Sequence, residues 1–297
     1  MNNKLKGVCF GEILFDVFLE HKKIGGAPLN VASRIKSLGG SISIISAVGS
    51  NSNGRELIEY IKNLGINIKT IEVKNDYPTG LVNVILNERG NASYDIHYPS
   101  AWDKIEPSVA NTSIVEEADF LVYGSLASRD AVSRNTLKQL LEVAKYKIFD
   151  VNLRVPHYTQ KTLIDLLNAA NFIKFNDDEL FEIAGYLKST HKSLEQNIKF
   201  IAKETNTEVV CVTLGSHGAV LYWENKFYYN SGFKVKVIDT VGSGDSFLAS
   251  LIVKLLDEKD PQYALNYACA VGAIVAQYEG ANPIIHQSEI DEFLNGF

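Results

Sequence analysis

The most informative stretch of the chain reads Asp239-Thr240-Val241-Gly242-Ser243-Gly244-Asp245-Ser246-Phe247, and a long apolar segment follows it. Its two glycines allow the backbone to approach a ligand closely. The apolar segment predicts a helix, whose first turn would direct free N–H groups and the positive end of the helix dipole at that ligand. The stretch therefore predicts an anion site formed by the backbone of Gly242, Ser243 and Gly244.

Asp245 stands in the expected anion site, where it could take the proton of an acceptor hydroxyl. A plain loop, followed by an acid in the first turn of a helix, explains the same residues equally well. The stretch is not a Walker P-loop, since the chain contains no Gly-Lys pair. It also lacks the third glycine of the dinucleotide-binding fingerprint, which disfavours an oxidoreductase.

A second glycine-rich segment, near the N-terminus, reads Ile24-Gly25-Gly26-Ala27-Pro28-Leu29-Asn30-Val31-Ala32. Gly25 and Gly26 precede a proline in a position that starts helices, so this loop also allows close approach of a ligand. Asn30 can both donate and accept hydrogen bonds. Taken alone, the segment is better explained as a tight turn into a helix.

The composition is that of an ordinary globular chain of 297 residues, 46% hydrophobic and 22% charged. The net charge of −6 argues against nucleic acid or an anionic membrane surface as a partner, and no apolar run reaches the length of a membrane span. Cys9, Cys211 and Cys269 show no zinc spacing, so we expect free thiols in a reducing compartment. The N-terminal residues lack the apolar core of a signal peptide, and we predict a cytoplasmic protein.

Strand-like and helix-like segments alternate through most of the chain. This alternation predicts an α/β fold with a mostly parallel sheet that helices cover on both faces. The predicted strands of this sheet are residues 6–10, 41–48, 66–73, 120–123, 147–151, 172–175 and 209–213, and residues 219–230 resemble a hairpin. Helices are expected near Pro28, over 54–64, and from near Ser243, Pro261 and Ser288.

Two β-rich regions interrupt the alternation. Residues 80–86 and 92–98 flank Asn87-Glu88-Arg89-Gly90-Asn91, which predicts a hairpin, and residues 15–24 also lack a helical period. We predict a single domain over residues 1–297, with a small β-sheet lid drawn from about residues 12–25 and 78–105. Ligands of open parallel sheets sit beyond the carboxyl ends of the strands. The segments expected on that rim are residues 12–16, 25–30, 150–154 and 176–179, with Gly215.

The two glycine-rich segments, in this order and near opposite ends of the chain, resemble the two signatures of the ribokinase-like (pfkB) carbohydrate kinases. The resemblance covers essentially the whole chain. Residues 10–16 are similar to the family's opening strand and sugar-binding acid, and residues 150–154 to the Asp-x-Asn-x-Arg stretch of its fructokinase and 2-keto-3-deoxygluconate kinase branch. Residues 176–179 resemble its Asn-x-x-Glu motif, and residues 212–219 its nucleotide-edge strand and loop.

The resemblance implies a three-layer αβα core, a β lid over the sugar, and phosphoryl transfer from ATP to a sugar hydroxyl. Asp245 would be the general base, and the amides of Gly242, Ser243 and Gly244 would hold the transferred phosphate. The residues expected at the sugar are Asp16, Gly26, Asn30, Asn152 and Arg154, although Arg154 could instead face the phosphate. The residues expected at the nucleotide are Asn176, Thr213, Gly215 and Gly218.

The resemblance also implies two kinds of cation. Asn176 and Glu179, one helical turn apart, would hold Mg²⁺ through water, because Mg²⁺ gives up its water reluctantly. Considered alone, these two residues are better explained as a capped helix start. A monovalent cation, K⁺, is implied near Asp239 and the loop before Pro283.

The lid departs from the family pattern, in which a basic residue often precedes a Ser-Ala-Asp-like stretch. Residues 90–103 contain no Arg or Lys, and His97 is the candidate cation there. A lid without a strong cation favours a neutral ketohexose over a sugar acid. Tyr98 and Trp102 are expected to pack on the sugar ring or, with equal weight, within the lid or against a second chain.

The predicted function is that of an ATP-dependent fructokinase that makes fructose 6-phosphate and forms a homodimer through its lid. A 2-keto-3-deoxygluconate kinase is the next alternative, followed by another sugar or nucleoside kinase of the family. The alternative outside catalysis is an inactive member that senses sugar or nucleotide. It is disfavoured because the chain keeps Asp245 and the glycines before it.

Overall fold

The central sheet is built from strands that are apolar along most of their length. In the computed structural model, which describes residues 4–86, 92–257 and 260–295, these strands are buried almost throughout except at the two edges of the sheet, where they are half-buried or exposed. They are β1 (Lys6–Phe10), β4 (Ser41–Gly49), β5 (Ile71–Lys74), β8 (Phe120–Gly124), β9 (Lys147–Asp150), β10 (Phe172–Asn176), β11 (Val209–Thr213), β12 (Ala219–Trp223) and β13 (Lys226–Asn230). The nine strands lie in the order β13-β12-β11-β10-β9-β8-β1-β4-β5. Neighbours from β11 to β5 pair in parallel, and the predicted hairpin β12–β13 adds an antiparallel edge.

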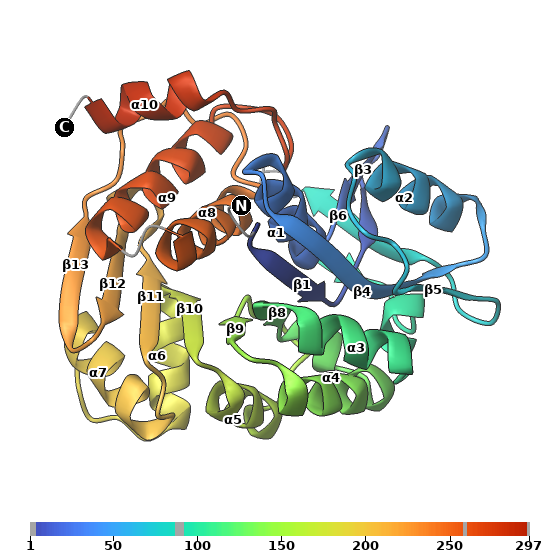
Figure 1. The fold of residues 1–297 in the computed structure, drawn as a ribbon, viewed down its shortest axis with the longest axis horizontal. Coiled ribbons are helices and arrows are strands. Elements are labelled where there is room, and N and C mark those ends of the chain that lie inside the picture. Colours follow the sequence, from blue (N-terminus) through green and yellow to red (C-terminus); the bar gives the residue numbers. More distant parts are fainter. Residues whose placement is uncertain (1–3, 87–91, 258–259, 296–297) are drawn as a thin grey trace.

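Helices cover both faces of the sheet and give the predicted three layers (Figure 1). One face carries α1 (Ala27–Ser37), α2 (Ser52–Asn63), α8 (Ser243–Asp257) and α9 (Pro261–Val275), and α10 (Gln287–Asn295) packs on α9. The other face carries α3 (Val109–Glu117), α4 (Ala131–Val143), α5 (Gln160–Ala169), α6 (Asp177–Tyr186) and α7 (Leu194–Glu204). Short 3₁₀ helices are Ala101–Lys104, Leu126–Ser128 and Gly215–His217. Within the described ranges, none of the helices combines the length and apolarity needed to cross a membrane.

Two predicted boundaries are corrected by side-chain hydrogen bonds. α2 begins at Ser52, before the expected Gly54, because Asn51 Oδ1 accepts a hydrogen bond from the Gly54 amide at 3.0 Å. The strand expected over 66–73 pairs continuously with β4 only from Ile71, after an isolated bridge between Ser43 and Asn67. Between these points Thr70 Oγ1 donates to the Ile44 carbonyl at 2.8 Å. A side-chain hydrogen bond thus replaces a backbone hydrogen bond between the two strands.

The lid is a separate four-stranded sheet, as predicted. Its strands are β2 (Leu14–Val17), β3 (Lys22–Gly25), β6 (Gly80–Leu86) and β7 (Ala92–Ile96), in the order β3-β2-β6-β7. β2 and β6 pair in parallel, and the other two pairs are antiparallel. The turn predicted at residues 87–91 lies outside the described residues. Since β2 starts shortly after β1 ends, the lid leaves the core at the carboxyl edge of the sheet, where ligands are expected.

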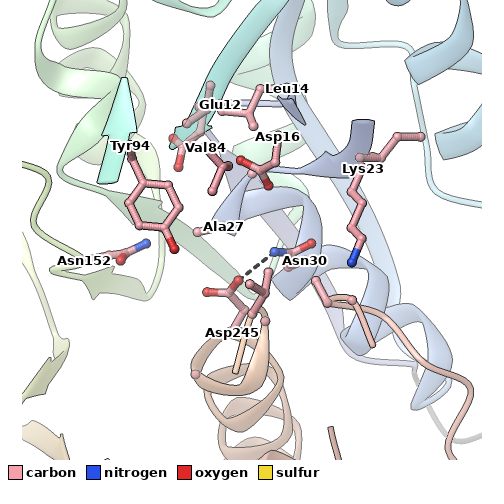
Figure 2. A pocket seen from close by; sticks show the side chains of 18 of the residues that line it. Glu12, Leu14, Asp16, Lys23, Ala27, Asn30, Val84, Tyr94, Asn152 and Asp245 are labelled. Carbon is pink, nitrogen blue, oxygen red and sulfur yellow. Dashed lines mark hydrogen bonds between the residues drawn. The ribbon is translucent and has the colours of Figure 1, made fainter. Parts of the chain in front are cut away.

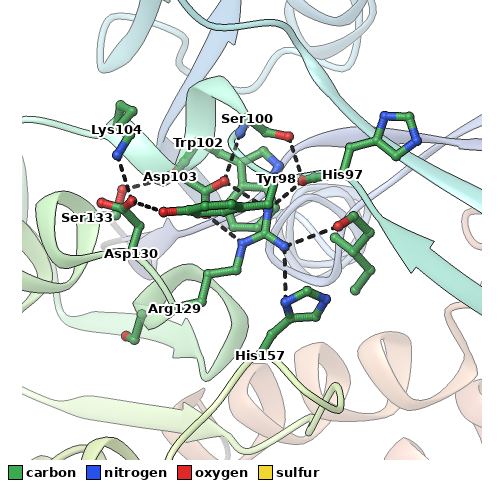
Figure 3. A network of polar contacts seen from close by, with 12 residues as sticks. His97, Tyr98, Ser100, Trp102, Asp103, Lys104, Arg129, Asp130, Ser133 and His157 are labelled. Carbon is green, nitrogen blue, oxygen red and sulfur yellow. Dashed lines mark hydrogen bonds and ion pairs between the residues drawn. The ribbon is translucent and has the colours of Figure 1, made fainter.

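A buried ion pair fixes the chain where it leaves the lid (Figure 3). Arg129 Nε donates to Asp103 Oδ1 at 2.7 Å, and the two side chains are 4% and 0% exposed. Arg129 Nη2 donates to the His97 carbonyl at 2.6 Å, directly after β7. The guanidinium also lies 4.1 Å from the centroid of the Trp102 ring. One side chain of the core thus holds three points of the segment that follows the lid.

Replacing Asp103 by Asn should lower the free energy of unfolding by about 3–5 kcal/mol, because the buried Arg129 charge loses its partner. Urea denaturation monitored by circular dichroism measures the loss. The matched control is Asp165→Asn, which breaks an ion pair with Lys161 at a side chain that is 38% exposed. That control should cost less than about 1 kcal/mol. Equal losses in the two variants would contradict the importance of the buried pair.

Candidate active site

A cavity of about 570 Å³ lies between the lid and the carboxyl ends of the core strands. Figure 2 shows the side chains that face it from both sides. Those from the lid and its connection to β1 include Glu12, Asp16, Lys23, Val84 and Tyr94, and those from the core include Asn30, Asn152 and Asp245. The structure therefore brings together most of the rim segments expected from the parallel topology.

Asp245 lies at the floor of this cavity, in the first turn of α8. Its Oδ2 accepts a hydrogen bond from Asn30 Nδ2 at 2.8 Å, and Asn30 Oδ1 accepts one from Asn282 Nδ2 at 2.8 Å. Burial raises the pKa of Asp245 to about 6, and the nearby Asp150 charge raises it further, while the Asn30 bond opposes the shift. A carboxyl with this pKa changes its charge close to neutrality, as suits a general base.

The loop before α8 has the conformation that the sequence predicts for an anion site. Gly242 has φ 76°, and a Cβ there would come within 2.5 Å of the Ala281 backbone. Ser243 starts α8, and its Oγ donates to the Gly272 carbonyl at 2.7 Å. The backbone around Gly244 is open to the cavity, since a Cβ on it would have Lys174 Nζ as its nearest neighbour, at 3.5 Å. The Ser243 amide already donates to the Thr240 carbonyl at 3.2 Å, so the Gly244 amide is the first-turn N–H group best placed to reach a ligand.

The lid side of the cavity holds two buried acids, of which sequence analysis assigned a role to one. Asp16, on β2, is the predicted sugar-binding acid, and burial raises its pKa to about 6. Glu12, just before β2, is 4% exposed, and burial raises its pKa to about 7. Its Oε2 has no hydrogen-bond partner among the described residues. Gly26 lies against the same segment, because its φ of 111° and a Cβ contact of 2.5 Å to the Glu12 carbonyl exclude a side chain.

Tyr98 and Trp102, expected at the sugar ring, lie away from the cavity. Trp102 is fully buried in a small apolar cluster with Leu14, Val82, Ile96 and Leu126. The Tyr98 hydroxyl donates to Asp130 Oδ2 at 2.9 Å at the base of the lid. β7 ends at Ile96, so the alternation that turns Tyr94 into the cavity does not extend to Tyr98. Tyr94 is the lid tyrosine that lines the cavity.

Lys23 is a cavity cation that sequence analysis missed, because the family pattern places the basic residue of the lid just before the Ser-Ala-Asp-like stretch, far from residue 23 in the chain. It stands on β3, next to Lys22 and just before the first glycine pair. Its Nζ lies 2.7 Å from Glu279 Oε1 and 4.0 Å from Asp239 Oδ2. The signal was present in the sequence, since Lys22 and Lys23 fall in the extended run assigned to the lid. The lid therefore does carry a strong cation.

Asp239, expected near a monovalent cation, organises the loops beside the anion site. Its Oδ1 accepts from the Val241 amide at 3.0 Å, and its Oδ2 accepts from the Gly280 amide at 3.0 Å. The carboxylate thus fixes the loop that leads to Gly242 and the loop around residue 280. Each oxygen keeps a second lone pair, but Lys23 supplies a positive charge close to Oδ2.

Asn176 and Glu179 form the capping box at the start of α6. Asn176 Oδ1 accepts from the Glu179 amide, and Glu179 Oε2 accepts from the Asn176 amide, both at 2.8 Å. Glu179 Oε1 accepts from the Leu153 amide at 2.8 Å, and the side chain is 6% exposed. Both oxygens therefore bind backbone, as the helix-capping interpretation predicts, and they suit Mg²⁺ only through water.

Asn152 and Arg154 both line the cavity on the loop after β9. Asn152 has φ 39°, a conformation that asparagine tolerates better than most residues. Arg154 Nη1 donates to the neighbouring Leu153 carbonyl at 2.9 Å. Its positive charge lowers the pKa of Glu12, Asp16 and Asp245 alike. Arg154 therefore lies within electrostatic reach of both the sugar side and the base.

A second cavity, of about 690 Å³, meets the first at Thr240 and Gly244. Of the residues expected at the nucleotide, Thr213, Gly215 and Gly218 line this cavity, whereas Asn176 lines neither cavity. Its apolar wall was not predicted, and it comes from Phe233, Phe247, Cys269, Ala273 and Ala276. A slot with apolar walls and glycine loops suits a planar base, with its phosphates directed to the start of α8.

Two cavities thus meet beside the N-terminus of α8, and Asp245 lies in the first turn of this helix. This geometry suits an enzyme that transfers an anionic group between two small molecules on an αβα scaffold. The profile of the pfkB family carbohydrate kinase matches residues 4–287, and the chain belongs to this family. The predicted fold and the prediction of an ATP-dependent carbohydrate kinase are thereby confirmed.

The chain is similar along its whole length to proteins named fructokinase. A fructokinase of Solanum tuberosum is 30% identical, and the match covers 97% of this chain and 95% of that protein. The crystal structure of a Vibrio cholerae O395 fructokinase bound to fructose, ADP and calcium has a TM-score of 0.83 at 25% identity, covering 98% of this chain and 99% of that one. An ATP-bound fructokinase of Xylella fastidiosa, with a TM-score of 0.87 at 22% identity over 98% of both chains, supports the fold alone.

Proposed function

We propose that this carbohydrate kinase is a fructokinase, which transfers the γ-phosphoryl group of ATP to fructose and makes fructose 6-phosphate. The observation that carries the proposal is Asp245, which is hydrogen-bonded to Asn30 in the first cavity and directly follows Gly244, where the two cavities meet. The full-length similarity to fructokinases supports fructose as the sugar.

In the proposed reaction, Asp245 accepts the proton of the sugar hydroxyl. The hydroxyl oxygen then forms its bond to the γ-phosphorus as the bond to the ADP oxygen breaks. The amides of Gly242, Ser243 and Gly244 hold the transferring group, since this reaction needs mainly positioning and neutralisation of charge. Asp16, Asn30 and Asn152 fix the sugar by hydrogen bonds to its hydroxyls, and Gly26 leaves room for close approach.

Mg²⁺ is the proposed metal, held through water by Glu179 and Asn176. Their carboxylate and amide oxygens suit Mg²⁺, and each accepts one backbone hydrogen bond, but neither side chain lines either cavity, so they would reach the metal only through water. Bound to the nucleotide, the metal would neutralise phosphate charge. K⁺ is the monovalent cation proposed near Asp239. The Lys23 ammonium already offsets part of the negative charge of this carboxylate.

A 2-keto-3-deoxygluconate kinase remains the second candidate, and Lys23 strengthens it, because a sugar acid needs a cation. Lys23, however, already faces Glu279 and Asp239, and the sugar side of the cavity carries Asp16 and Glu12. A substrate carboxylate beside these acids would be repelled. A neutral sugar avoids this cost.

Fructose should exceed 2-keto-3-deoxygluconate by at least about tenfold in kcat/KM, because an unpaired or repelled carboxylate costs that much or more. A coupled assay of ADP release, run with both sugars at matched concentrations, measures the ratio. Ribose and adenosine serve as neutral controls of other shapes. The reverse ranking would overturn the choice of sugar and leave the kinase class intact.

Asp245→Asn should lower kcat by about 10²–10⁴-fold, because the variant loses the base. The fold should persist, since an amide oxygen can still accept the hydrogen bond from Asn30. The control, Asp257→Asn, changes the exposed acid at the other end of α8 and should leave kcat within about twofold. If Asp245→Asn retained more than about a tenth of wild-type kcat, Asp245 would not be the base.

The kcat/KM for fructose should fall at acid pH with an apparent pKa near 6. The pKa of Asp245 is raised to about 6, so the unprotonated base is present above that pH and is lost about tenfold per unit below it. Asp16 and Glu12, with pKa values of about 6 and about 7, titrate in the same pH range. The fall in rate at acid pH therefore reports the three carboxyls together. A pH–rate profile measures it, and a flat profile down to about pH 5 would contradict the assignment.

We further propose a homodimer formed through the lid, because a small sheet with one apolar face is marginal on its own. Val82, Val84 and Tyr94 face the cavity, whereas Ile85 lies on the opposite face of the lid and is 57% exposed. Light scattering at micromolar concentration should give twice the chain mass, and Ile85→Glu should shift it toward the monomer. A monomeric wild-type mass would count against the dimer.

A further inference from the structure

A buried lysine in the middle of the sheet has no role in the reaction described so far. Lys174, on β10, lies opposite Asp150 of β9 in the parallel register, and its Nζ donates to Asp150 Oδ1 at 3.0 Å. The two side chains are 9% and 5% exposed. Burial alone would lower the pKa of Lys174, but the charges of Asp150 and Glu179 raise it overall, so the ammonium stays protonated.

The ammonium lies at the start of α8, where a helix dipole disfavours a cation. Lys174 Nζ is 3.5 Å from the position of a Cβ on Gly244, and Lys174 lines the first cavity together with Gly242, Gly244 and Asp245. The N-terminus of a helix carries partial positive charge, so a structural ion pair gains nothing from this location. Two sources of positive charge that converge on one open point indicate an anion there.

Buried polar atoms in and beside the Lys174–Asp150 pair lack hydrogen-bond partners in the described part of the chain, which also indicates a ligand. Asp150 Oδ2 and Glu12 Oε2 are both buried and have no hydrogen-bond partner among the described residues. An ammonium has three N–H donors, and Asp150 takes one of them. Buried polar groups are normally satisfied, so the cluster is arranged for groups that arrive with the substrates or with ordered water.

We propose that Lys174 is a catalytic residue that donates a hydrogen bond to the transferring phosphoryl group, and that Asp150 is the positioning residue that aims its ammonium. During transfer, charge spreads over the three equatorial phosphoryl oxygens, and a fixed ammonium in a water-poor site stabilises it. Lys174 stays protonated throughout, since the hydroxyl proton goes to Asp245. The inference rests on the proposed transfer reaction, and it adds a side-chain cation to an anion site otherwise formed by backbone amides.

The alternative is that the pair only stabilises the core. Removing one member of a buried ion pair is strongly destabilising, whereas replacing both members is often tolerated. A structural role therefore predicts that Lys174→Met loses activity through unfolding and that the double variant Lys174→Met/Asp150→Asn recovers it. A catalytic role predicts that the double variant recovers stability without activity.

The experiment measures kcat, KM for fructose and ATP, and urea unfolding for Lys174→Met, the double variant and Lys174→Arg. Lys174→Met should lower kcat by about 10²-fold or more, with KM for fructose within about threefold of wild type. The double variant should unfold near the wild-type midpoint and remain as inactive, and Lys174→Arg should recover part of kcat. The control is Lys74→Met. Lys74 is a largely buried lysine of β5 that lines neither cavity, and the variant breaks its ion pairs with Glu72 and Glu106.

A second readout separates the transition state from ground-state binding. ADP with aluminium fluoride and fructose should bind Lys174→Met at least about tenfold more weakly than wild type, while ADP alone binds equally. A double variant with kcat within tenfold of wild type, or an unchanged affinity for the aluminium fluoride complex, would overturn the proposal. If the wild type phosphorylates a different sugar, the same series is run with that sugar, so failure of the fructose assignment remains distinct from failure of the Lys174 role.

Discussion

The hydrogen bond between Asn30 and Asp245 is the contact on which the geometry of the site depends, because it joins two helix starts 215 residues apart in the chain. Asn282 donates to Asn30 Oδ1, which leaves Asn30 Nδ2 facing the carboxylate and so fixes the orientation of the amide. α1 and α8 pack against each other on one face of the sheet, and both begin at glycine loops open to the same cavity. The two glycine segments are therefore parts of one site.

Charges at the floor of the cavity explain why the pKa of Asp245, the proposed base, lies at about 6. Asp245 is buried and has Asp150 nearby, and both effects oppose its ionisation. Asn30, Lys174 and Arg154 act in the opposite sense. An isolated buried carboxylate would be protonated, and a fully paired one would be a weak base. The partial compensation keeps Asp245 between these limits, which is where proton transfer is efficient.

Sequence analysis predicted those features that depend on local pattern. Apolar periodicity predicted the parallel strands and the flanking helices, and the glycine segments predicted Gly26, Asn30 and Asp245. It could not predict Lys174, because a lysine in an apolar strand acquires its partner only through the register with Asp150 on the next strand. It left open whether Tyr98 and Trp102 pack on the sugar or within the lid, because their directions depend on where β7 ends and on packing beneath Arg129. Such features are set by tertiary contacts between distant segments.

Acidic and basic side chains lie on different sides of the cavity, and this separation bears on which substrates fit. Acids stand on the sugar side, where Asp16 and Glu12 can accept hydrogen bonds from hydroxyls. Cations stand toward the phosphate side, with Lys174 at Gly244 and Lys23 near Asp239, just before the loop that binds the anion. In such a field, a neutral sugar and a polyanionic nucleotide each meet groups of complementary character. A sugar acid would place its charge against these acids, so the charge distribution that suits the proposed phosphate site also disfavours a charged sugar.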